Sequence, residues 1–255
     1  MIIESHPNGT PCWVDLSSPD LDGARRFYSA VLGWDWTTSG PEHGHYSQGL
    51  VDGQPVAGLG PLPTDSGARP AWTVYFATGD ADATVGALQA RGGGVVVPAM
   101  DVGPMGRMAI VSDPGGAVFG LWQPGEHSGS RRMGVHGATC WFEVNASDAT
   151  AMQGFYADLF EMQREVMTLS GTPYFTLHKE GKPRAGVLQM DDQWEGVPPH
   201  WMVYFAVDDT DAAVERVREA GGSLCHGPFD TSFGRMAIVN DPAGAVFTLI
   251  KPPRP

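Results

Sequence analysis

The sequence contains nearly the same pattern of residues twice. Pro-Cys-Trp-Val-Asp-Leu at 11–16 returns as Thr-Cys-Trp-Phe-Glu-Val at 139–144, and a Phe-Tyr pair at 27–28 returns at 155–156. Gly-Arg-Met-Ala-Ile-Val at 106–111 returns at 234–239, so that each pattern recurs 128 positions later. A period this long indicates a duplicated domain rather than a solenoid, and the two copies can be compared position by position.

The duplication predicts two domains of similar size. We expect the first domain at residues 1–124, the second at 137–255, and a polar, glycine-rich linker at 125–136 between them. Because paired modules are already supplied within one chain, a monomer or a loose homodimer is expected.

The composition limits the partners and the compartment. A formal net charge of −13 argues against a nucleic-acid partner, because phosphate backbones need a basic surface. No apolar run reaches the roughly 18 residues that cross a bilayer, and none at the N-terminus resembles a signal peptide. Three cysteines form neither a disulfide framework nor a zinc spacing. We therefore expect a cytoplasmic protein that contacts no membrane.

Each copy repeats one order of secondary-structure elements. In the first copy the pattern predicts a strand at 12–17, a helix from Asp20 to Gly33, loosely alternating segments over 46–59, a strand at 72–77, a helix at 80–91, and strands near 95–98, 107–112 and 117–122. These segments form two βαβββ modules per copy. Since strands outnumber helices and helices would cover one sheet face, the expected fold class is α+β.

The module order carries a family resemblance. Paired βαβββ modules, a helix with Phe-Tyr after an aspartate, and a closing Asp-Pro-x-Gly-x-x-Phe strand resemble the vicinal oxygen chelate superfamily. That superfamily includes glyoxalase I, extradiol dioxygenases and bleomycin-resistance proteins. The chain is similar over essentially its whole length to the two-domain, actinobacterial glyoxalase-like subgroup, often labelled hydroxylases of antibiotic pathways. The resemblance implies curved, cup-like mixed sheets with helices outside and a small molecule inside.

The resemblance also identifies where a metal would be held. The positions that correspond to the metal ligands of the superfamily are Trp13, Thr73 and Gly120 in the first copy and Trp141, Met202 and Thr248 in the second. Zinc, iron and manganese prefer imidazole, thiolate or carboxylate ligands, and none of these six side chains is one. We therefore expect no metal cofactor.

Strand alternation predicts which side chains line the cups. If Trp13 and Trp141 face inward, so do Asp15 and Glu143, whereas Cys12 and Cys140 face the helices. The same alternation places Thr73, Tyr75, His200, Met202 and Tyr204 inside the cups. A tryptophan, a carboxylate and a tyrosine in each cup suit a planar or aromatic ligand. The alternative is that the indoles fill a collapsed cup.

The carboxylates and histidines are the candidate acid/base groups. Asp15 and Glu143 are expected either to move a proton on a substrate or to form salt bridges with Arg107 and Arg235. In the absence of such bridges, the two arginines are candidate ligand contacts. Only the second copy adds histidines on its strands, at His178, His200 and His226. This asymmetry makes Glu143, His200 and Tyr204 the candidate catalytic cluster.

These residues predict a metal-independent protein that binds a small aromatic or polyketide-like molecule and transforms it by acid/base chemistry. Two alternatives remain open. One is a drug-sequestering protein without catalysis, similar to bleomycin-resistance proteins. The other is glyoxalase-like detoxification of methylglyoxal with an unconventional metal site.

Overall fold

The computed structural model describes residues 2–62, 67–169 and 171–253 and contains the four expected βαβββ modules. The first copy consists of β1 (Pro11–Ser18), α1 (Leu21–Leu32), β2 (Asp35–Thr38), β3 (Ser47–Val51), β4 (Gln54–Pro61), β5 (Ala71–Ala77), α2 (Ala81–Gln89), β6 (Gly94–Asp101), β7 (Gly106–Ser112) and β8 (Val118–Pro124). The second copy consists of β9 (Thr139–Ala146), α3 (Ala149–Phe160), β10 (Gln163–Leu169), β11 (Thr172–Lys179), β12 (Lys182–Gln189), β13 (His200–Ala206), α4 (Thr210–Glu219), β14 (Ser223–Thr231), β15 (Gly234–Asn240) and β16 (Val246–Lys251). Three single-turn 3₁₀ helices interrupt the loops at Pro41–His43, Gly103–Met105 and Asp192–Trp194. The α+β fold class expected from the sequence is confirmed.

The four α-helices of the described residues begin in the same way. The aspartates at 20, 80, 148 and 209 each accept a hydrogen bond from the backbone N–H three residues later. This capping satisfies one of the donors that a helix leaves unpaired at its N-terminus. The first helix also ends as expected, because Gly33 adopts a left-handed conformation with φ of 74°.

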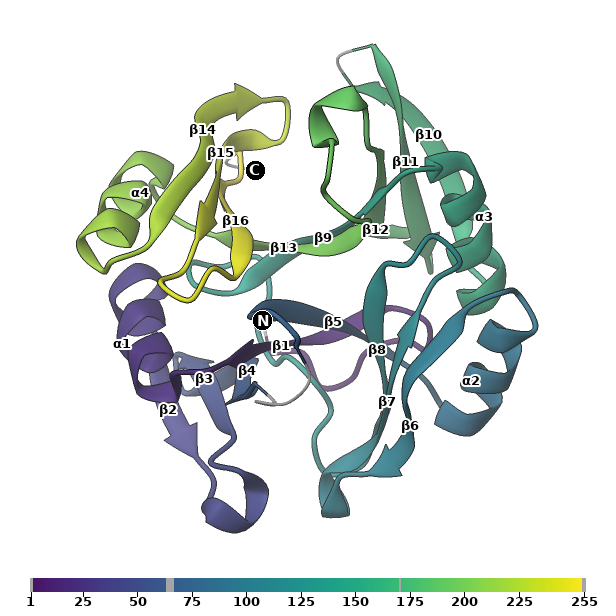
Figure 1. Ribbon diagram of the computed structural model, residues 1–255, viewed down its shortest axis with the longest axis horizontal. Helices are drawn as coiled ribbons and strands as arrows, with labels where there is room; N and C mark the ends of the chain where they lie inside the picture. The colour runs from purple at the N-terminus through teal and green to yellow at the C-terminus, as the bar shows by residue number, and fades with distance from the viewer. Residues whose placement is uncertain (1, 63–66, 170, 254–255) are drawn as a thin grey trace.

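Each copy forms one eight-stranded mixed sheet. The strand orders are β2-β3-β4-β1-β5-β8-β7-β6 and β10-β11-β12-β9-β13-β16-β15-β14. In both, the first strands of two modules pair antiparallel at the centre, β1 with β5 and β9 with β13. The outer strands of each module curl away from this centre, so that each sheet forms a cup (Figure 1).

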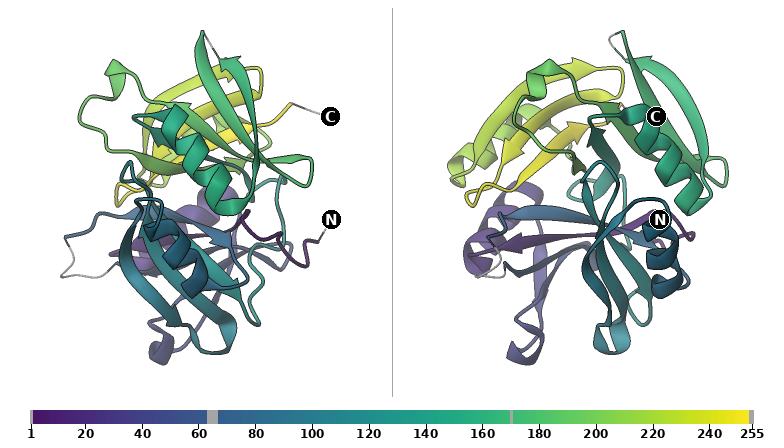
Figure 2. Two further views of the ribbon diagram at one scale, coloured as in Figure 1. Left: turned by 90° about the vertical axis from the view of Figure 1, so that its right-hand side faces the viewer. Right: turned by 45° about the vertical axis from the view of Figure 1, so that its right-hand side comes forward.

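The two sheets pack back to back, and their cups open in opposite directions (Figures 1 and 2). One continuous hydrophobic core joins both copies, and the helices lie at its two ends, α1 beside α4 and α2 beside α3. Aromatic side chains dominate this core: Phe76 stacks on Phe160 at 4.6 Å, and Trp34 meets Phe205 edge-on at 5.5 Å. Among the helices of the described residues, none is both long and apolar enough to cross a membrane.

The repeated Phe-Tyr and Asp-Pro motifs meet across this interface. The Tyr28 hydroxyl donates to Asp241 of the other copy at 3.2 Å, and the Tyr156 hydroxyl donates to Asp113 at 2.8 Å. Both aspartates also accept backbone N–H groups of their own turns. A tryptophan indole donates to each tyrosine, from Trp72 and Trp201. The sequence repeat thus marks a reciprocal bond between the copies.

Loss of either tyrosine hydroxyl should destabilise the whole chain. Tyr28→Phe or Tyr156→Phe removes a buried donor to a carboxylate, so we expect the free energy of unfolding to fall by about 1–3 kcal/mol. Denaturant unfolding followed by circular dichroism measures the change. Thr150→Ala, at an exposed position of α3, is the control and should stay within about 0.5 kcal/mol of the native protein. Equal stability of the tyrosine variants and this control would contradict the reciprocal bond.

Candidate functional site

The cup of the second copy encloses a cavity of about 690 Å³. Its size lies within the range of small-molecule sites. The walls are mainly apolar and aromatic, with Trp141, Leu188, Met202, Phe229, Met236, Ile238 and Ile250 among the lining residues. Polar side chains lie at the floor and at the mouth, where Glu165 and Asp230 stand on opposite arms of the cup.

A buried carboxylate forms the centre of the floor. Glu143 is 7% exposed, and its two oxygens accept hydrogen bonds from the hydroxyls of Tyr174 at 2.7 Å and Tyr204 at 2.8 Å. The Trp141 indole donates to the Tyr174 hydroxyl at 2.9 Å. The carboxylate, both phenols and the indole therefore form one connected network that faces the cavity.

Burial makes this carboxylate more basic than an exposed glutamate. Desolvation raises the pKa of Glu143, and the two phenol hydrogen bonds only partly oppose that rise. Burial and the nearby carboxylate also raise the pKa of Tyr174 and Tyr204, so both phenols stay protonated as donors. A carboxylate with a raised pKa beside two phenols can exchange protons with a bound molecule.

A glycine creates the space for this network. A Cβ at position 186 would lie 1.8 Å from the Tyr174 hydroxyl, so only glycine admits the phenol. Position 186 pairs with Glu143 across β12 and β9. The first copy uses the same arrangement: a Cβ at Gly58 would lie 1.8 Å from the Tyr46 hydroxyl.

The first copy contains an equivalent network. The Trp13 indole donates to Tyr46 at 3.0 Å, and Asp15 accepts from Tyr75 at 3.1 Å and from Tyr46 at 3.5 Å. Burial raises the pKa of Asp15 to about 7. Thr73 lies opposite Asp15 in the strand register and is half-buried.

The segment between the copies covers this first network. The His127 ring meets Trp13 edge-on at 4.4 Å, and its carbonyl accepts the Trp122 indole N–H at 2.8 Å. The backbone N–H of Ser130 donates to the Cys12 carbonyl. The expected linker is therefore packed against the first cup, with His127 buried enough that desolvation lowers its pKa to about 4.

Burial differs accordingly between equivalent residues. Trp13 is 4% exposed and Tyr75 is buried, whereas Trp141 and Tyr204 are only half-buried and face the cavity. The Trp13 indole is thus buried beneath the segment between the copies. The second cup is open.

The expectation that the cysteines face the helices is wrong. Cys12 clusters with Trp13, Tyr75 and Trp122 on the cup side, and Cys140 lines the second cavity. The cause is a register shift between Pro11 and Trp13, repeated opposite Tyr204 and Phe205, where strand alternation breaks. Burial raises the pKa of Cys140 to about 12, so this thiol stays protonated.

The structure separates His200 from the expected catalytic cluster. Its ring bonds to Asn145 and to the Pro198 carbonyl, and it does not line the cavity. Met202 lines the cavity, as expected. His226 and His178 line the walls, where His178 bonds to Thr176.

Both arginines pair with exposed aspartates. Arg107 forms ion pairs with Asp82 and Asp101, both at 2.8 Å. Arg235 pairs in the same way with Asp211 at 2.6 Å and Asp230 at 3.2 Å. The expected salt bridges from Asp15 and Glu143 are therefore wrong, while the ligand contacts expected of the two arginines stay predictions. The partners of both carboxylates are phenols.

The expected metal positions do converge, but their donors do not fit a metal. Trp141 and Thr248 both pair with Tyr204, and Met202 pairs with Glu143. In the first copy Gly120 gives room to the Tyr75 ring, which a Cβ there would meet at 2.1 Å. Within the described residues, no group of three or more His, Cys, Asp or Glu side chains could hold a metal ion.

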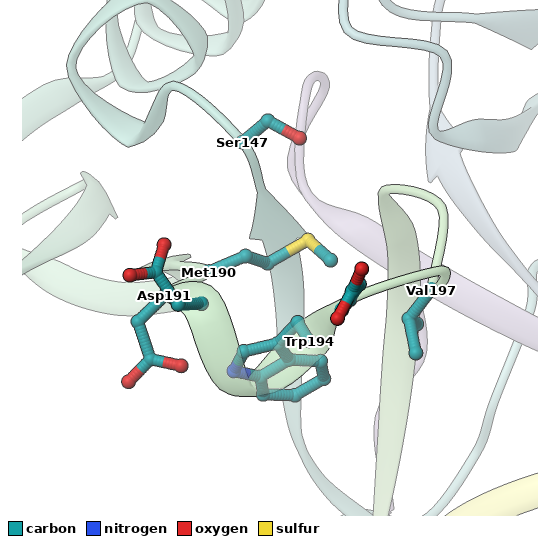
Figure 3. A pocket seen from close by; sticks show the side chains of 7 residues that line it. Ser147, Met190, Asp191, Trp194 and Val197 are labelled. Carbon is teal, nitrogen blue, oxygen red and sulfur yellow. The ribbon is translucent and has the colours of Figure 1, made fainter.

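A second hollow, of about 450 Å³, lies outside the cup beside the 3₁₀ turn Asp192–Trp194. Figure 3 shows Trp194, Met190 and Val197 around it, with carboxylates on its rim. Trp194 lines both this hollow and the cup, so the turn forms part of the cup wall.

Sequence reasoning missed Tyr46 and Tyr174, the phenols that join indole to carboxylate. They are equivalent residues, 128 positions apart, within segments expected to be strands. Their recurrence was the available signal.

Comparisons with known proteins agree with this geometry. The family model described as Glyoxalase/Bleomycin resistance protein/Dioxygenase superfamily matches residues 12–121 and again 140–249. The chain is 36% identical to the putative glyoxylase CFP32 of Mycobacterium bovis, covering 96% of this chain and 95% of that protein. It is 37% identical to the anthracycline biosynthesis protein DauV of Streptomyces sp. strain C5, covering 95% and 93%.

Solved structures share the fold at low identity. A Mn(II)-bound glyoxalase from Novosphingobium aromaticivorans has a TM-score of 0.66 at 17% identity, covering 96% of this chain and 82% of that one. An extradiol ring-cleaving dioxygenase from B. fuscum has a TM-score of 0.67 at 15% identity, covering 99% and 74%. The chain belongs to the glyoxalase/bleomycin resistance protein/dioxygenase superfamily.

Asp15 should make stability depend on pH in a defined direction. Because its folded-state pKa of about 7 lies above the unfolded value, its protonated form stabilises the fold at low pH. That contribution is lost as pH rises from about 4 to 7. We expect the stability of the native protein, measured relative to Asp15→Asn by urea unfolding, to fall over this window. A difference that stays constant with pH would contradict the buried state of Asp15.

Proposed function

We propose that the second cup binds a planar polycyclic molecule of the anthracycline type and moves a proton on it without a metal. The observation that carries this proposal is the Glu143–Tyr174–Tyr204 network at the floor of an open, apolar cavity. A relative of similar length that is named for anthracycline biosynthesis supports the ligand class. The ligand would lie beside the Trp141 indole, which Tyr174 holds in place.

The chemistry follows from the positions of the groups. Glu143 in its ionised form would take a proton from an acidic carbon of the bound ring. As Glu143 takes up the proton, one of the phenols would turn its single hydrogen from that carboxyl group to the substrate oxygen on which charge develops. Return of the proton to another carbon or oxygen completes an isomerisation or prepares a ring closure. Three free cysteines suit a reducing, cytoplasmic compartment.

Sequestration of a drug is the second candidate. It is favoured by the fact that both oxygens of Glu143 already accept a phenol hydrogen bond. Metal-dependent glyoxalase chemistry has less support, because tryptophan, methionine and threonine at the superfamily's ligand positions are poor donors for divalent metals.

Binding should depend on one tryptophan of the repeated pair. Trp141→Phe removes the indole that faces the cavity, so we expect the Kd for anthraflavic acid to rise by about two- to tenfold. This compound is a dihydroxyanthraquinone with one hydroxyl at each end of its ring system. Trp13→Phe, in the covered cup, is the matched control and should leave the Kd unchanged. Titration followed by the visible absorbance of the quinone measures both. Equal effects of the two variants would contradict the assignment to the second cup.

Proton transfer should depend on one carboxylate of the repeated pair. In heavy water, the native protein should accelerate deuterium uptake at the acidic methylene of anthrone, a planar three-ring ketone. Glu143→Gln should reduce this acceleration by about 10²–10⁴-fold, because the amide cannot act as a base. Asp15→Asn should keep it. The measurement is the loss of the methylene proton signal under anaerobic conditions.

If anthrone binds but no exchange is accelerated, the catalytic half of the proposal is wrong and sequestration is favoured. If neither anthrone nor anthraflavic acid binds, the ligand class is wrong.

A further inference from the structure

Two buried polar atoms in the second cup have no hydrogen-bond partner within the described part of the chain. They are Oδ1 of Asn145 and Oγ1 of Thr248. Both residues are 1% exposed, and both line the cavity. Buried polar atoms are nearly always paired in folded proteins, because an unpaired one loses its hydration without compensation. Since both residues line the cavity, a ligand bound there is a source for the missing bonds.

His200 determines which end of the Asn145 amide faces the cavity. Nδ1 of the ring lies 2.9 Å from the Pro198 carbonyl, which can only accept, so Nδ1 carries the hydrogen. In the neutral ring Nε2 is then an acceptor, and it lies 3.1 Å from Nδ2 of Asn145, which donates to it. The amide nitrogen is thereby held by His200, and the amide oxygen remains as an acceptor for a ligand.

This arrangement is present in the second copy alone. The residues at the corresponding positions of the first copy are Ser17 and Ala71, which also pair in the strand register. The first sheet folds without the amide and the imidazole. Their presence in the open cup is thus not required by the fold.

The positions of the two atoms define the length of the ligand. Trp141, Tyr204 and Thr248 lie at one level across β9, β13 and β16. Asn145 lies four residues further along β9, and Glu143 lies between the two levels. Strand geometry gives about 13 Å along the strand and about 10 Å across two strand spacings. A ligand that contacts both ends must be elongated, as a linear fused-ring molecule is.

We infer that Asn145, oriented by His200, accepts a hydrogen bond from a hydroxyl at one end of an elongated fused-ring ligand. Thr248 contacts a polar group toward the other end, and Glu143 faces the middle rings. This inference rests on the proposed function and narrows its ligand to molecules with a hydroxyl donor at one end. His200 is a positioning residue, since it acts through the amide and does not line the cavity.

The test compares two ligands that differ only in the donor. Anthraflavic acid presents a hydroxyl at each end, and its dimethyl ether keeps the rings and the oxygens but cannot donate. The native protein should bind the acid about tenfold more tightly than the ether, because the ether leaves the amide oxygen unpaired. Asn145→Ser and His200→Ala introduce the residues that the first copy carries, so the fold is expected to tolerate both.

Asn145→Ser should reduce this preference severalfold while the affinity for the ether stays close to native. His200→Ala should also reduce the preference, because the freed amide can turn its nitrogen toward the ligand. If either residue has a purely structural role, its substitution will weaken the binding of acid and ether equally, and that result would overturn the inference. Equal binding of acid and ether by the native protein would also overturn it. Failure of both ligands to bind would overturn the proposed function, and this inference with it.

Discussion

The architecture depends on two buried tyrosine–aspartate hydrogen bonds that cross between the copies. Tyr28 reaches Asp241, and Tyr156 reaches Asp113, each in the turn that precedes the last strand of the other copy. Burial raises the pKa of both aspartates, because it removes water from their carboxylates. The surrounding donors replace the hydrogen bonds that water would supply. Together with the shared aromatic core, these bonds join the two sheets back to back, and this packing leaves the concave faces to open outward (Figure 1).

Back-to-back packing allows the concave faces to differ without cost to the core. Both cups keep the same floor of indole, phenol and carboxylate, from Trp13 to Asp15 and from Trp141 to Glu143. They differ in what lies above it. In the first copy the segment that contains His127 covers the floor, while in the second the floor borders a cavity. One floor thus serves as core packing and the other as a candidate site.

The sequence predicted the fold well because periodicity and capping are local signals. The aspartate caps, Gly33 and the four modules all follow from patterns within about ten residues. The inward positions of Trp141, Glu143 and Tyr204 followed from strand alternation. The same rule failed at Cys12 and Cys140, because a register shift near the start of each strand depends on the partner strand.

Side-chain partners were harder to predict than positions. Arg107 pairs with Asp82 on a helix and with Asp101 on the neighbouring strand, contacts that no spacing in the sequence reveals. His200 contacts Asn145, the residue directly opposite it on the adjacent strand β9, and does not contact Glu143. Only the strand register distinguishes these two partners. Coverage of the first cup by His127 depends on the path of a segment without regular structure. The histidines of the second copy distinguished the copies in the sequence, whereas the structural difference is the coverage of the first cup.

We propose that only one of the two duplicated cups, that of the second copy, binds a small molecule. The most direct test is the number of molecules bound per chain, measured by isothermal titration calorimetry with anthraflavic acid. We expect one molecule per chain for the native protein. Two molecules per chain with similar affinity would contradict it, because the first cup would then be as accessible as the second.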